Sequence, residues 1–150
     1  MGFIDNIKDV TGAGGAIPRN DINRMNEHAE RYYEEIRKRT GDIQVISKNT
    51  GFSIEDVQII KNHIFFNKYD LGEEFPERFA PDYDMAVSWQ RLIDGKNIHE
   101  MDLIMLNHEL MEYNLMLNKS LSYYEAHELT QIKYNYIKYV KELNEKEGVR

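Results

Sequence analysis

Apolar residues recur every three or four positions over most of the chain, which is the spacing of amphipathic helices. The first long stripe contains Ala29, Tyr32 and Ile36, and no segment shows convincing strand alternation. Capping residues and glycines divide the pattern into predicted helices that, with their caps, cover residues 20–41, 42–51, 53–64, 82–95, 97–117 and 122–143. We therefore predict an all-α fold, a compact bundle of five to six helices.

The connections between these helices differ in length. Gly72, Pro76 and Pro81 indicate a long loop at about 67–81. The connection at 118–121 is short, so the last two predicted helices must fold back on each other as a C-terminal helical hairpin. We predict that residues 1–19 form a flexible N-terminal segment with a glycine-rich linker and that 20–145 form a single helical domain.

Composition narrows the kinds of chemistry that the chain can carry. Its 150 residues include no cysteine, which excludes disulfides and thiolate nucleophiles, so a divalent metal would need His, Asp and Glu ligands. No apolar run is long enough to cross a membrane, and the N-terminal MGFIDNIKDV lacks a signal-peptide pattern. We expect a cytoplasmic protein, or one that is delivered as part of a larger carrier protein.

The formal net charge of −7 opposes broad contact with a nucleic-acid backbone. Residues 42–62 have the apolar and glycine spacing of a helix-turn-helix, but the outward positions of the second helix carry Glu55, Asp56 and Gln58. Carboxylates at these positions would repel DNA phosphates. We therefore do not expect broad DNA binding, and DNA recognition by this element is the weakest functional hypothesis.

The hairpin carries the main chemical candidates, in the stretch HELMEYNLMLNKSLSYYEAHE at 108–128. On a helix His108 and Glu112 share a face, as in the zinc-binding HExxH motif, with a carboxylate in place of the second histidine. His127 lies about as far beyond the turn as Glu112 lies before it. His108, Glu112 and His127 are thus candidate ligands of a divalent metal, with Glu109 or Glu128 as general base.

Two alternatives remain open for this stretch. One is catalysis without a metal by the His/Glu set, which consists of His108, Glu109, Glu112 and His127. The other is a structural contact in which Glu112 accepts a hydrogen bond from His127 and fixes the hairpin.

Other polar side chains are candidates for the wall of a pocket, namely His63, Arg78, Asp84 and Arg91. We interpret His63 mainly as a core residue or a partner of the helix dipole, with acid–base catalysis as the alternative. Asp82 is interpreted as a helix cap, and His28 and His99 as surface residues.

Three blocks of sequence, in order, carry a family resemblance: NTGFSIEDVQIIKNHIF, RFAPDYDMAVSWQRLIDG and LNHELMEYNLMLNKSLSYYEAHE. They resemble a C-terminal module of phage head-morphogenesis (minor head) proteins and of related polymorphic toxins, over roughly 28–136. The resemblance implies a junction to a larger carrier at 11–20 and a toxin-like effector, commonly a nuclease or another hydrolase. It brings forward, without assigned roles, His63, Arg78, Asp82, Asp84, Trp89, Arg91, His108, Glu109, Glu112 and His127.

These observations lead to two functional hypotheses. In the first, the chain is a phage- or toxin-associated, effector-like hydrolase, a nuclease or other phosphoesterase, that uses the His/Glu set. In the second, it is a non-catalytic phage structural or protein-interaction module. Its tyrosine-rich last helix, YYEAHELTQIKYNYIKYV, would then bind a phage component, an immunity-like protein or a second copy of the chain.

Overall fold

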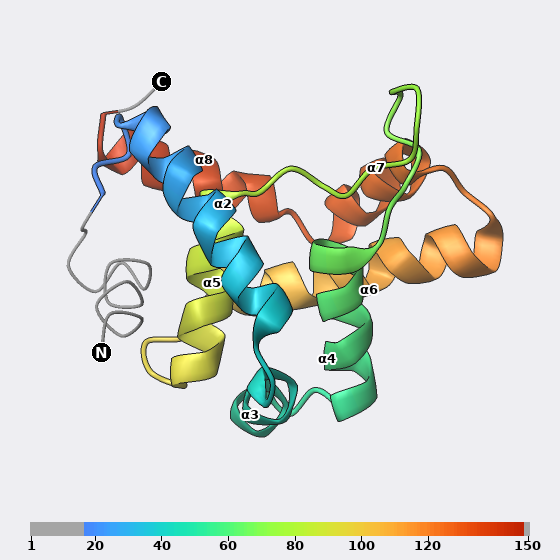
Figure 1. The fold of residues 1–150 in the computed structure, drawn as a ribbon, viewed down its shortest axis with the longest axis horizontal. Helices are drawn as coiled ribbons and strands as arrows, with labels where there is room; N and C mark the ends of the chain where they lie inside the picture. The colour runs from blue at the N-terminus through green and yellow to red at the C-terminus, as the bar shows by residue number, and fades with distance from the viewer. Residues whose placement is uncertain (1–16, 149–150) are drawn as a thin grey trace.

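The computed structural model describes residues 17–148, which form seven α-helices, one short π-helix and no sheet (Figure 1). The elements are α2 (Ile22–Lys38), α3 (Asp42–Thr50), α4 (Ile54–Lys61), η1 (Asn62–Phe66), α5 (Tyr83–Asp94), α6 (Glu100–Lys119), α7 (Tyr123–Lys133) and α8 (Tyr136–Lys146). The predicted all-α fold class is confirmed. The long loop between η1 and α5 is also present, and an isolated antiparallel bridge joins Tyr69 to Glu77 within it.

Most helix boundaries follow from local capping chemistry. The side chains of Ser53, Asp82 and Ser122 accept hydrogen bonds from backbone N–H groups in the first turns of α4, α5 and α7, as predicted. The start predicted at residue 97 for the next helix is wrong, because the cap position is occupied by His99. Helix α6 begins at Glu100, and the carboxylate of Asp102 accepts the His99 N–H at 2.9 Å.

The hydrophobic core lies where α2, α4, α5 and α6 meet, and Trp89 of α5 is fully buried within it. Its indole N–H donates to the carboxylate of Asp42 at 3.2 Å, and the ammonium of Lys61 lies 2.9 Å from the same group. We predicted Asp42 as the cap of α3, but its side chain turns inward to these partners and Gly41 occupies the cap position. The buried charges are thereby paired, as burial requires.

Helices α6 and α7 form the predicted C-terminal hairpin and lie side by side (Figure 1). The single helix predicted at 122–143 is instead two helices, because the helical conformation is interrupted at Tyr134 and Asn135. Asn135 then caps α8 by accepting the Lys138 N–H at 3.0 Å. The break turns α8 back toward α6 and buries Tyr136 in the core.

The folded domain begins before the predicted boundary at residue 20. Residues 1–16 of the predicted flexible segment lie outside the described residues, but Ile17 and Arg19 are described and buried. The guanidinium of Arg19 makes two hydrogen bonds to Asp84 of α5, at 2.7 and 2.9 Å. Among residues 17–148, no helix combines the length and apolar character needed to cross a membrane.

Candidate metal-binding site

Three elements bring five titratable side chains together. His63 comes from η1, His108, Glu109 and Glu112 from α6, and His127 from α7. The π-helical turn continues α4 and places His63, which is fully buried, against α6. Such local widening of a helix is frequent at functional sites.

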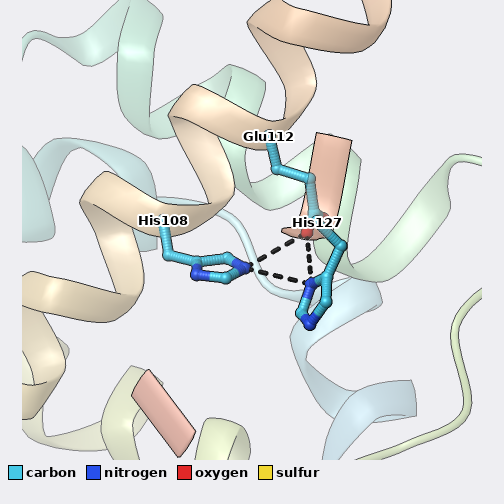
Figure 2. A group of neighbouring side chains, drawn as sticks. All are labelled: His108, Glu112 and His127. Atoms are coloured by element: carbon cyan, nitrogen blue, oxygen red, sulfur yellow. Dashed lines mark hydrogen bonds and ion pairs between the residues drawn. The ribbon is translucent and has the colours of Figure 1, made fainter. Parts of the chain in front are cut away.

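The carboxylate of Glu112 contacts all three histidines of this cluster, and Figure 2 shows it with His108 and His127. Its Oε1 lies 2.7 Å from His63 Nε2, and its Oε2 lies 2.8 Å from His127 Nδ1 and 3.1 Å from His108 Nε2. Only 1% of the Glu112 surface is exposed, so these contacts replace hydration of the carboxylate. The convergence of His108, Glu112 and His127 predicted from the hairpin is present in the structure.

The proton on His63 is fixed by its neighbours. The Glu112 carboxylate can only accept, so His63 Nε2 carries a hydrogen and donates it to Oε1 at 2.7 Å. His63 Nδ1 lies 2.6 Å from the Tyr69 hydroxyl, which also accepts the Asn67 amide N–H at 3.0 Å. His63 therefore positions one oxygen of the central carboxylate.

His108 has the opposite tautomer when it is neutral. Its Nδ1 lies 2.8 Å from the carbonyl oxygen of Tyr134, which can only accept, so Nδ1 carries the hydrogen. The lone pair on Nε2 then faces Glu112 Oε2 at 3.1 Å and His127 Nδ1 at 3.3 Å. Such a meeting of acceptors is favourable only when a proton or another cation lies among them.

The three facing atoms have the spacing of ligands around a small cation. Two ligands bound tetrahedrally at about 2.0–2.1 Å from zinc lie about 3.3 Å apart. The distances among His108 Nε2, Glu112 Oε2 and His127 Nδ1 are 2.8, 3.1 and 3.3 Å. These three side chains could hold a metal ion after a slight widening. A second group, His63, Glu109 and Glu112, is looser, since His63 Nε2 lies 3.9 Å from Glu109.

The two carboxyl groups of the cluster have pKa values shifted in opposite directions. Burial acts to raise the pKa of Glu112, but hydrogen bonds from the three histidines hold that pKa well below its ordinary value. Burial, followed by the charge of Glu112, raises the pKa of Glu109. Burial acts to lower the pKa of His108, and the Glu112 hydrogen bond with the nearby Glu109 charge raises it overall.

A cavity of about 380 Å³ adjoins the cluster. It is lined by His108, Glu109, Glu112 and His127 together with Tyr33, Ile64, Phe79, Ala80, Asp82, Met85, Met105, Tyr123, Tyr136, Ile137 and Val140. The Oε2 atom of Glu109 is buried and has no hydrogen-bond partner within the described part of the chain. A buried carboxyl oxygen of this kind is available to a water molecule or a ligand in the cavity.

The predicted pocket wall requires correction. His63 belongs to the cluster itself, whereas Asp84 is paired with Arg19 and Arg91 is paired with Asp102 at 2.7 Å. Neither Asp84 nor Arg91 lines the cavity, because these ion pairs commit their side chains to joining chain segments. Arg78 is exposed in the long loop and does not line it either. Phe79 from that loop supplies the wall instead.

The exposure of His28, His99 and Glu128 can be compared with the predictions made for these residues. His28, predicted at the surface, is 4% exposed, with its ring 6.1 Å from that of Tyr83. His99 is exposed as predicted. Glu128, one candidate general base, is exposed and does not line the cavity, whereas Glu109 does.

Several tyrosines of the predicted last helix make contacts within the domain. Tyr136 is buried, Tyr139 packs on the core and Tyr123 lines the cavity. Tyr124 is exposed, and its hydroxyl donates to the Leu71 carbonyl at 2.7 Å. Binding of a protein partner or a second copy of the chain stays a prediction.

Comparison of the chain with protein-family models, with curated protein sequences and with solved structures found no match. Any function must therefore be inferred from the side chains themselves.

Proposed function

We propose that this domain is a metal-dependent hydrolase with one divalent cation of the zinc type, held by His108, Glu112 and His127. The observation that supports this function is the spacing of three potential ligand atoms, 2.8–3.3 Å apart, beside a cavity. Two histidines and one glutamate are a ligand set of catalytic zinc, which leaves a coordination position for water or substrate.

The contacts behind the ligands support the same proposal. The Tyr134 carbonyl fixes His108 with its lone pair on Nε2, and His63 holds one oxygen of Glu112. Partners of this kind orient metal ligands and are found behind many metal sites. A hydrogen bond serving only to fix the hairpin would need one histidine, whereas three converge here.

Glu109 is the best placed proton carrier. A bound cation would supply an activated water and would polarise the bond to be cleaved. The Glu109 carboxylate would take one proton from the water as its oxygen bonds to the substrate, and would return that proton to the leaving group as the old bond breaks. Its raised pKa suits exchange of protons closer to neutral pH than an ordinary carboxyl allows.

The sequence resemblance supports a setting for this activity. In that setting the domain is an effector at the end of a phage or toxin carrier protein, and an immunity-like protein is its partner. A non-catalytic interaction module is the second candidate, favoured by the exposed apolar side chains Leu129 and Ile132 on α7.

Metal analysis tests the proposal directly. We expect purified full-length chain, loaded with zinc and dialysed, to retain about one ion per chain. His108→Ala and His127→Ala should each weaken zinc binding by at least roughly 100-fold. His99→Ala, which changes an exposed histidine outside the cluster, should bind zinc like the unaltered chain. Equal zinc binding by all three variants would show that the cluster does not hold the metal.

A further inference from the structure

The cavity beside the cluster lacks the cations that a phosphate substrate needs. No Lys or Arg is among the described residues that line it, and its charged side chains other than histidine are Asp82, Glu109 and Glu112. Enzymes that transfer or cleave phosphoryl groups place Lys, Arg or several metal ions around the phosphate oxygens. A phosphodiester entering this cavity would meet carboxylates instead.

The arginines of the adjoining elements cannot easily supply that charge. Arg91 of α5 is held by Asp102 at 2.7 and 2.8 Å, and Arg19 is held by Asp84. Arg37 of α2 donates to the Phe65 carbonyl at 2.6 Å. Moving any of them into the cavity would break a part-buried contact and leave its carboxylate or carbonyl partner unpaired.

The walls of the cavity suit an apolar or aromatic group. The rings of Phe79 and Tyr123 lie 4.9 Å apart at one side, and methionine and aliphatic side chains supply much of the rest. Methionine adapts to ligands of irregular shape and makes favourable contacts with aromatic rings. The volume of about 380 Å³ lies near the lower end of small-molecule pockets, so it admits one side chain and the bond to be cleaved.

We propose that the substrate is a carboxylic amide or ester with an apolar or aromatic acyl group, rather than the phosphoester expected from the sequence. This inference rests on the hydrolase function proposed above. The water oxygen forms a new bond to the carbonyl carbon, and the bond from that carbon to nitrogen or oxygen breaks. One water proton passes through Glu109 to the departing amine or alcohol. The other proton stays with the carboxylic acid, so the reaction yields these two products.

Turnover of two substrates with the same leaving group tests the bond type. Zinc-loaded chain is assayed with p-nitrophenyl phenylacetate and with bis(p-nitrophenyl) phosphate, and each rate is corrected for that of the chelator-treated chain. We expect kcat/KM for the ester to exceed that for the phosphodiester by at least roughly 100-fold. p-Nitrophenyl acetate, whose acyl group lacks the phenyl ring, should be cleaved about 10-fold less efficiently than the phenylacetate.

Met85→Arg places a cation in the cavity without changing a proposed metal ligand. It should retain zinc, lose at least about 10-fold in kcat/KM for the phenylacetate and gain relative activity on the phosphodiester. A zinc-loaded chain that prefers the phosphodiester, or cleaves neither substrate above the chelated control, overturns the substrate inference and leaves the metal site standing. Absence of zinc binding in the same samples instead overturns the proposed function, and the inference with it.

Discussion

The Nδ1 atom of His108 lies 2.8 Å from the carbonyl oxygen of Tyr134, at the point where the chain leaves α7 and before α8 begins. The break between the two helices therefore has a chemical consequence. A carbonyl inside a continuous helix would be engaged by the N–H four residues later. Here it accepts the Tyr136 N–H at 3.1 Å together with the imidazole N–H, and the latter contact sets which nitrogen of His108 faces Glu112.

Asn135→Ala should affect both stability and metal binding. The side chain of Asn135 caps α8, and its loss should cost about 1 kcal/mol of the free energy of unfolding. Because the cap also fixes the break beside Tyr134, zinc affinity should fall by roughly threefold to tenfold. Urea unfolding and calorimetric zinc titration measure the two effects.

Ser53→Ala is the matched control for this change, since it removes a cap from α4 with a similar bond, to the Asp56 N–H at 3.0 Å. It should lower stability by about the same amount and leave zinc affinity unchanged. If both variants lower zinc affinity equally, general destabilisation explains the result and the break has no special role.

His63→Ala should weaken zinc binding although His63 is not among the three proposed ligands. It removes the donor to Glu112 Oε1 at 2.7 Å, so the carboxylate loses its orientation and affinity should fall by about 10–100-fold. Tyr69→Phe removes only the hydroxyl that contacts His63 Nδ1, and should produce a smaller loss of the same sign. An unchanged zinc affinity in His63→Ala would mean that Glu112 is positioned without it.

Part of this site could be predicted from the sequence because it depends on short-range geometry. Residues four apart on a helix share a face, so His108 and Glu112 had to lie together. A short connection had to return the next helix alongside, which brought His127 to the same level. The all-α fold follows equally from the spacing of apolar residues and from caps such as Ser53 and Ser122.

The rest depends on contacts between residues far apart in the chain. The contact of His63 with Glu112 spans 49 positions, and nothing near His63 in the sequence indicates that partner. Arg91 and Asp84 looked available beside a long loop, but Asp102 and Arg19 neutralise them. Asn135 was a usable signal that was missed, because an asparagine within a helical pattern favours a cap or a break.

Arg19→Ala should show that the folded domain begins before residue 20. Arg19 makes a paired contact with Asp84, whose side chain is 13% exposed, so removal of Arg19 leaves a largely buried carboxylate without this partner. We expect a loss of about 2–4 kcal/mol in the free energy of unfolding. Arg24→Ala breaks an exposed pair with Asp21 at 3.8 Å and should cost less than about 0.5 kcal/mol. Equal stability of the two variants in urea unfolding would contradict the assignment of Arg19 to the domain.

The stability of the metal-free chain should fall as the pH rises above neutrality. The pKa of His108 is raised from 6.5, so its contribution is fully present below 6.5 and is lost as the pH rises through the higher folded value. The pKa of Glu109 is raised from 4.5 to about 7, so its contribution is also lost with rising pH, but over that lower range. Glu112 has a lowered pKa, so its contribution is present above 4.5 and is lost only in stronger acid.

Bound zinc should reverse this dependence, because its ligands must be deprotonated and protons compete for His108. We expect the Tm of the metal-free chain to decrease as the pH rises above 6.5, and the Tm of the zinc-loaded chain to stay level or increase. His108→Ala should flatten the metal-free profile, since the imidazole whose pKa is raised is gone. Thermal unfolding followed by circular dichroism measures all three profiles. Parallel profiles with and without zinc would show that the metal does not displace a proton from this cluster.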